Sequence, residues 1–351
     1  MELNIDTPKR LHWVDIAKGI LIFMVILAHF DVMSITAGVD HAGTKYIRVL
    51  NFLFTSYYMA AFFVLTGYTT NFKKEFSTFL ISSFKSLIIP AFCFSVLTQI
   101  LLAILFKDRS YVDSIIKPEF FIYGFKSYWF LIALFWARVC YWLLNRFIPS
   151  DIAKGGILLV FMLIGLYLSS KYRDTPNSPF TNNPFFYLHF MRMAFYLWIG
   201  QMYKKYESSI KLEYLMVGGV FCVVLSIVFR ALGILIPNAN YLINFDFTIK
   251  EFIKYLFFTL SGSGLIIYLS KKLRSNKLLE FFGRNSLTVY VTHFCIIIYI
   301  YYITKPLLRI SDSSVYGAMY SFFVAILTFF VCYFIIILFN KRPFKFLLGK
   351  F

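Results

Sequence analysis

The stretch LHWVDIAKGILIFMVILAHF, residues 11–30, decides the fold class of this chain. It is almost continuously apolar and long enough to cross a bilayer, because about 20 apolar residues span the hydrocarbon core of a membrane. It also carries Asp15, Lys18 and His29. Ionisable side chains at membrane depth are costly, so a helix that keeps them is expected to line a cavity or pack on other helices. The stretch therefore predicts a first membrane span with an inward polar face.

The rest of the sequence contains more runs of this kind. They lie near residues 12–34, 49–69, 79–106, 127–147, 153–170, 185–203, 213–235, 250–271, 285–304 and 315–340, and predict about ten membrane helices. Of the 351 residues, 60% are hydrophobic and only 15% are charged, whereas charged residues make up about 25% of a soluble domain. We predict an all-α, polytopic integral membrane protein with a single membrane-embedded domain over residues 1–351.

The formal net charge of +18 is explained by the loops. Lys and Arg gather in short connections, more of them in the segments that lie inside if the N-terminus is inside. This bias predicts that both termini are cytoplasmic, and a nucleic-acid partner is not expected. The five cysteines lie within apolar runs and form no CxxC pair, so no metal site or disulfide framework is predicted.

Basic residues outnumber acids inside the predicted spans. The basic ones are Lys18, Lys85, Arg138, Arg192, Arg230 and Lys254, whereas the acids are Asp15 and Glu251. Two explanations stay open at this point. The long side chains can reach the membrane interface, or an anionic ligand supplies the missing negative charge.

The first span orders its polar residues along one face. Lys18 and His29 are eleven positions apart, which is about three helical turns, and lie roughly 16 Å apart along the axis. Asp15, one turn before Lys18, lies on the same side and can pair with it. His29 can be a packed, hydrogen-bonded histidine or a functional base, and the row with Lys18 favours the second interpretation. For His293, a structural role is favoured.

These residues carry a resemblance to a known family. The first span resembles the opening of the acyltransferase family 3 membrane proteins, whose mark is a basic residue, ten residues and then histidine on the first helix. Lys18 and His29 match that spacing. Similar segments follow in order along nearly the whole chain: FFVLTGYTTNF (62–72), FKSLIIPAF (84–92), YWFLIALFW (128–136), YLWIGQMYKK (196–205) and GRNSLTVYVTHF (283–294). Family members typically have ten spans, and this chain is similar to the short, fucose 4-O-acetylase-like form without a fused extracytoplasmic domain.

The resemblance implies a bacterial inner-membrane O-acetyltransferase. It would take the acyl group from acetyl-CoA and transfer it to a sugar hydroxyl of a cell-surface glycan or its lipid-linked precursor. The candidate catalytic residues are His29 as base, Lys18, and Asp15 as its charge partner. The candidate CoA-binding residues are Lys18, Lys85 and Arg138, although family relatives often carry several arginines where this chain has Lys85 alone. A transporter or flippase of an anionic glycolipid is the alternative, since it would also need unpaired cations in the membrane.

Overall fold

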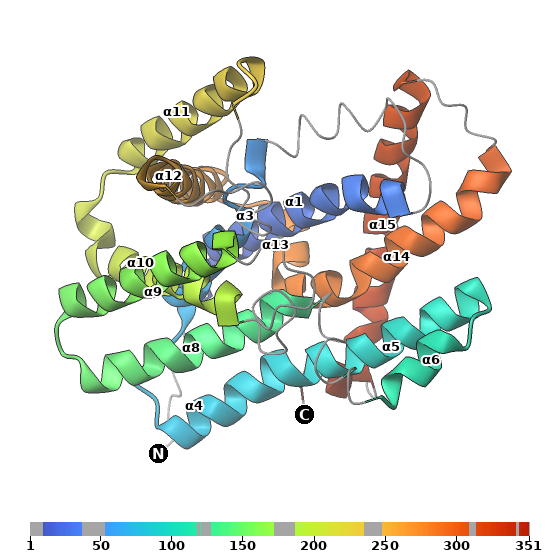
Figure 1. Cartoon of the computed structure of the whole chain (residues 1–351), viewed down its shortest axis with the longest axis horizontal. Helices are drawn as coiled ribbons and strands as arrows, with labels where there is room; N and C mark the ends of the chain where they lie inside the picture. The colour runs from blue at the N-terminus through green and yellow to red at the C-terminus, as the bar shows by residue number, and fades with distance from the viewer. Residues whose placement is uncertain are drawn as a thin grey trace.

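The computed structural model describes residues 10–36, 53–117, 120, 128–171, 187–234, 248–308, 314–341 and 344–350. Within these ranges the regular elements are all helices (Figure 1). The long ones are α1 (His12–Thr36), α3 (Tyr58–Thr69), α5 (Ile89–Phe106), α8 (Trp129–Phe147), α9 (Asp151–Lys171), α10 (Tyr187–Tyr206), α11 (Leu212–Ala231), α12 (Ile249–Lys272), α14 (Ser286–Leu308) and α15 (Ser314–Phe339). The short ones are α4 (Phe76–Ser83), η1 (Phe84–Ile88), α6 (Ser110–Ile115), η3 (Glu207–Ser209), α13 (Lys277–Arg284) and η4 (Phe344–Leu348).

The helices confirm the predicted all-α, multi-pass membrane architecture. In the described part of the chain, 8 helical segments are long and apolar enough to cross a membrane. Of the predicted spans, α3 falls short because only 12 residues of it are described as helix, and α10 carries polar residues such as Arg192 and Lys204. The predicted span ends at 49–52, 127, 185–186 and 235 lie outside the described residues.

Helix α1 is the central element of the fold. It contacts α3, α12, α13, α14 and α15, and Figure 1 shows it in the middle of the assembly. Its apolar residues Ile16, Leu21 and Val25 are completely buried. By contrast, α11 exposes large apolar side chains such as Tyr214 and Val217, as expected of a helix that faces lipid. Among the polar residues of α1, Asp15 is buried, Lys18 and His29 are partly buried, and His12 at its start is exposed.

Two glycines fix how α1 meets the short helix α13. A Cβ atom at Gly19 would overlap the carbonyl of Leu279, and one at Gly283 would overlap the carbonyl of Asp15. The two backbones therefore touch, which no larger residue at either position would allow without separating the helices. This contact positions the start of α1, including the turn that carries Lys18.

A proline shapes the helical segment that leads from α4 into α5. Pro90 has no N–H to offer the carbonyl of Ser86, and the turn before it widens into the π-helical element η1. The Ser86 hydroxyl instead donates a hydrogen bond to the carbonyl of Ser82 at 2.8 Å. In this turn Ser86 and Leu87 face the protein interior, whereas Lys85 is exposed.

Candidate active site

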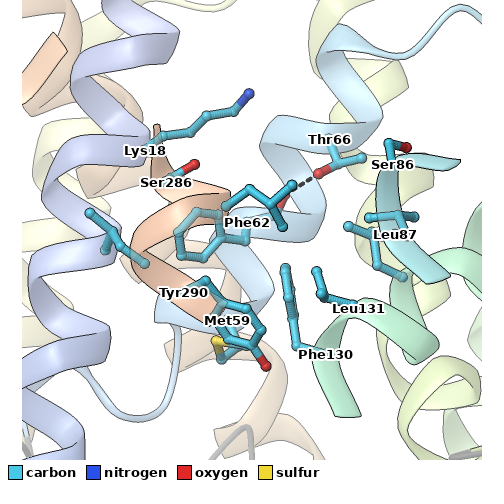
Figure 2. A pocket seen from close by; sticks show the side chains of 13 residues that line it. Lys18, Met59, Phe62, Thr66, Ser86, Leu87, Phe130, Leu131, Ser286 and Tyr290 are labelled. Atoms are coloured by element: carbon cyan, nitrogen blue, oxygen red, sulfur yellow. Dashed lines mark hydrogen bonds between the residues drawn. The ribbon is translucent and has the colours of Figure 1, made fainter. Parts of the chain in front are cut away.

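A cavity of about 150 Å³ lies between α1, α3, η1, α8 and α14 (Figure 2). Its lining is Lys18, Ile22, Met59, Phe62, Thr66, Ser86, Leu87, Phe130, Leu131, Leu134, Ser286, Leu287 and Tyr290. Figure 2 shows two different ends, which we call the polar end (Lys18, Thr66, Ser86 and Ser286) and the aromatic end (Met59, Phe130 and Tyr290). Such a cavity suits a ligand with a charged or polar head and an apolar arm.

Lys18 stands at the polar end as a cation without a counterion. It is half-buried, and it forms no ion pair with any residue that the structure describes. The carboxylate of Asp15, expected to be its partner, instead contacts Arg10 at 2.7 Å and Arg284 at 3.4 Å. Asp15 attracts Lys18 only through space. The amine is thus available to an anionic ligand.

The charges at the start of α1 are paired with one another. Glu280 of α13 accepts hydrogen bonds from Arg284 at 2.7 Å and from the Nδ1 atom of His12 at 2.9 Å. The hydrogen bond from His12, together with Arg284, holds the pKa of Glu280 below its usual range. Asp15 and Arg10 complete this group, which we call the paired end of α1. Its charges are used in joining α1 to α13.

His29 lies three turns beyond Lys18, and one of its ring nitrogens has no hydrogen bond to any residue that the structure describes. Its Nδ1 atom is 2.7 Å from the carbonyl oxygen of Val25. A carbonyl can only accept, so Nδ1 carries the hydrogen and Nε2 is left with its lone pair. The ring packs edge-on against that of His293 of α14, with centroids 4.7 Å apart. His29 therefore has the tautomer that a general base requires.

Helices α1 and α14 run in the same direction past the cavity. Lys18 and Ser286 both line its polar end, and farther along the two helices His29 meets His293. Tyr290, at the aromatic end, is one turn before His293, and their ring centroids are 5.9 Å apart. Tyr290 thus contacts both the cavity and His293, whereas neither histidine is among the residues that line the cavity.

The other two predicted CoA-binding residues differ in position. Arg138 lies one turn beyond Leu134, which lines the cavity. Its guanidinium stacks 5.3 Å from the ring centroid of Phe79, and its buried Nε has no hydrogen-bond partner among the described residues. Lys85 is exposed and does not line the cavity. The structure brings Arg138 near the site and leaves Lys85 outside it.

Other basic residues of the predicted spans have protein partners. Lys254 forms an ion pair with Glu251. Arg192 contacts the Nδ1 atom of His189, whose ring stacks on Trp129 with centroids 4.5 Å apart. Lys254 therefore has a countercharge within the protein, and Arg192 has a hydrogen-bond partner. Within the described chain, no group of three or more His, Cys, Asp and Glu side chains could hold a metal ion.

Comparison with known proteins identifies the family of the chain. The family model described as an acyltransferase domain, of the acyltransferase 3 type, matches residues 11–347. The chain belongs to the acyltransferase 3 family. No curated protein and no solved structure shows a significant match to it. The resemblance expected from the first span is confirmed, and the protein is a membrane acyltransferase.

Sequence reasoning missed the part that α14 plays in the site. His293 was interpreted as structural, yet the structure places it against His29. Tyr290 and Ser286, in the same segment, line the cavity. The signal was present in GRNSLTVYVTHF, because positions 286, 290 and 293 recur at helical spacing and so share one face.

Proposed function

We propose that this membrane acyltransferase moves an acetyl group from acetyl-CoA to a sugar hydroxyl of a bacterial cell-surface glycan or its lipid-linked precursor. The observation that carries the proposal is the pairing, on one face of α1, of an amine that forms no ion pair and an imidazole whose Nε2 has no hydrogen bond in the part of the chain that the structure describes. The first suits an anionic donor, and the second suits removal of a proton from an alcohol near neutral pH.

The shape of the cavity supports a CoA thioester as the donor. Lys18 at the polar end can bind a CoA phosphate, with Arg138 as a second cation near the site. The pantetheine arm is a long, thin chain that fits the apolar walls. Lys18 and His29 are roughly 16 Å apart along α1, a separation that such an extended arm can bridge. The thioester would then lie near the aromatic end.

The reaction needs one group that first accepts the proton of the hydroxyl and then donates it to the leaving thiolate. His29 Nε2 takes the proton of the sugar hydroxyl while the oxygen attacks the thioester carbonyl and forms the new O–C bond. The C–S bond breaks, and the imidazolium returns the proton to the leaving thiolate, so the products are the acetyl ester and free CoA. General acid–base catalysis of this kind contributes roughly 10²–10⁴-fold to the rate.

The proposed orientation follows from the charges of the loops. The excess of Lys and Arg in one set of connections supports cytoplasmic termini in a bacterial inner membrane. In that orientation Lys18 lies in the first turns from the cytoplasmic face, because α1 begins at His12. The polar end of the cavity would therefore open toward the compartment that holds acetyl-CoA.

The test uses washed membranes that contain the wild type or the His29→Gln variant, each shown to be folded by size-exclusion chromatography in detergent. Isotope-labelled acetyl-CoA is added, and labelled lipid-linked sugars and polysaccharide are detected by mass spectrometry. We expect label with the wild type and almost none with the variant. Equal labelling by both would remove His29 from the mechanism. No label in the wild type would reject the donor or acceptor class, and a glycolipid flux assay would follow.

A further inference from the structure

A second histidine completes the site from α14. His293 is 3% exposed, and its ring lies against that of His29 with an interplanar angle of 76°. The same ring is 5.9 Å from that of Tyr290, which lines the cavity. His293 thus contacts both the base proposed for the reaction and the aromatic end of the donor cavity.

The hydrogen bonds of His293 leave one nitrogen unused. Its Nδ1–H donates to the carbonyl oxygen of Val289 at 3.0 Å, so the lone pair is on Nε2. This Nε2 atom is buried and has no hydrogen-bond partner among the described residues. A buried polar atom without a partner lowers the stability of the folded protein. An apolar residue would fill this place without that cost, so the nitrogen needs an explanation.

The explanation lies in the charge that His29 acquires during the reaction. When His29 takes a proton it becomes an imidazolium inside the membrane domain. In the described structure, no carboxylate is hydrogen-bonded or ion-paired to either ring. The ring of His293 lies beside the new charge, and its Nε2 lone pair has no other partner among the described residues. A second imidazole can accept a hydrogen bond from an imidazolium, and an aromatic face attracts a cation.

We propose that His293 is a positioning residue that stabilises the protonated state of His29 during acyl transfer. The inference rests on the proposed function. The proton still passes from the sugar hydroxyl to His29 and then to the CoA thiolate, and His293 ends each cycle as it began. Its contribution is to orient the His29 ring and to share the positive charge through Nε2. It therefore acts on kcat rather than on acetyl-CoA binding.

Two substitutions distinguish the roles of the two ring nitrogens of His293. In His293→Asn the short amide can replace Nδ1 as donor to Val289 but does not reach the Nε2 position. In His293→Gln the longer amide places an acceptor near Nε2 without being able to ionise. We expect kcat to fall about 100-fold in the Asn variant and about 10-fold in the Gln variant, with the KM for acetyl-CoA changed less than about twofold.

The measurement is steady-state acetyl transfer by purified protein in nanodiscs, with His189→Gln as the matched control. His189 is also a histidine of a membrane helix, but its ring stacks on Trp129 rather than on His29, and we expect its variant to keep its kcat. A wild-type kcat in His293→Asn, or an Asn variant that is faster than the Gln variant, would overturn the role of Nε2. If His293→Asn does not fold, a wild-type kcat in His293→Gln overturns it equally.

The controls distinguish this inference from the function on which it rests. If the wild type transfers no acetyl group, the proposed function fails and this inference falls with it. If the wild type is active, His29→Gln is inactive and the His293 variants keep their kcat, only the role of His293 is rejected. If the wild type is active and the His293 variants lose kcat in the expected order, both proposals are supported.

Discussion

The two parts of α1 differ in whether their charged groups have partners in the protein. At the paired end, Asp15 contacts Arg10 and Arg284, while Glu280 contacts His12 and Arg284. On the face beyond it, which we call the open face, Lys18 has no ion pair and the Nε2 atom of His293 has no hydrogen bond within the described chain. Both parts belong to α1, but α13 supplies partners at the paired end and α14 supplies His293 at the open face.

This difference separates charges that hold the fold from charges available to a ligand. Paired charges at an interface contribute to the association of helices, and their removal should lower stability. Charges left unpaired in the interior lower stability, so they are kept where another group supplies the missing partner. Substitutions at the paired end should therefore reduce stability, and substitutions on the open face should reduce activity.

The sharpest test of this comparison uses one substitution at two places on α1. His29→Gln should lower kcat by about 10³-fold, because general base catalysis is lost, while the melting temperature stays close to the wild type. His12→Gln should keep the kcat of the wild type. Its free energy of unfolding should fall by about 1 kcal/mol, because a hydrogen bond to Glu280 is weakened. Acetyl transfer and thermal unfolding in detergent measure both. A fall in kcat for His12→Gln equal to that for His29→Gln would break the comparison.

The next effect concerns binding of the donor. Lys18→Gln removes the amine at the polar end of the cavity and should raise the KM for acetyl-CoA about 30-fold, which is within the range expected for a lost charged contact of about 2 kcal/mol. Lys85→Gln makes the same change of charge at an exposed side chain and should alter KM less than about twofold. The rate is measured against acetyl-CoA concentration at constant ionic strength. Equal increases in KM would assign both lysines to the donor site.

The open face was more predictable from sequence than its surroundings. Lys18 and His29 lie on one helix, so their common face follows from their spacing alone. The pairing of His29 with His293 joins residues that are 264 positions apart, and no local pattern encodes it. The partner of Asp15 was misplaced for the same reason, because Arg284 reaches it through the glycine contact between α1 and α13. The all-α architecture was predictable because it follows from the lengths of the apolar runs, which can be read directly from the local sequence.

A smaller effect, on stability, is expected when an ion pair at the paired end is removed. Asp15→Asn removes the charge that Arg10 and Arg284 share and should lower the free energy of unfolding by about 1–2 kcal/mol. Activity per folded molecule should change little, since Asp15 contacts neither the cavity nor His29. Thermal unfolding measures the stability, and the acetyl-transfer rate normalised to the amount of folded protein measures the activity. A large loss of kcat at unchanged stability would restore Asp15 to the chemistry, as the sequence predicted.

The smallest effect concerns a second paired group, formed around Glu207 in the connection between α10 and α11. Glu207 accepts hydrogen bonds from Tyr68 and Lys271 and so joins α3 to α12. Partial burial opposes its charge, but the hydrogen bonds from Lys271 and Tyr68 prevail and hold the pKa of Glu207 below its usual value. A carboxylate with a lowered pKa in the folded state stabilises the protein above its unfolded pKa, and this stabilisation is lost as the pH falls through the folded pKa.

Glu207→Gln should therefore lower stability by about 1 kcal/mol at pH 7. The difference from the wild type should shrink below the unfolded pKa, about pH 4.3, because the carboxylate of the unfolded chain then takes up a proton while the folded one stays ionised to lower pH. Glu75→Gln is the control, since Glu75 is exposed and contacts only the nearby Ser77, and it should show no difference at either pH. Melting temperatures at pH 7 and pH 4 decide the matter. A Glu207→Gln difference that persists undiminished at low pH would mean that Glu207 stabilises the fold through packing, and the contrast between paired and open charges would not extend beyond α1.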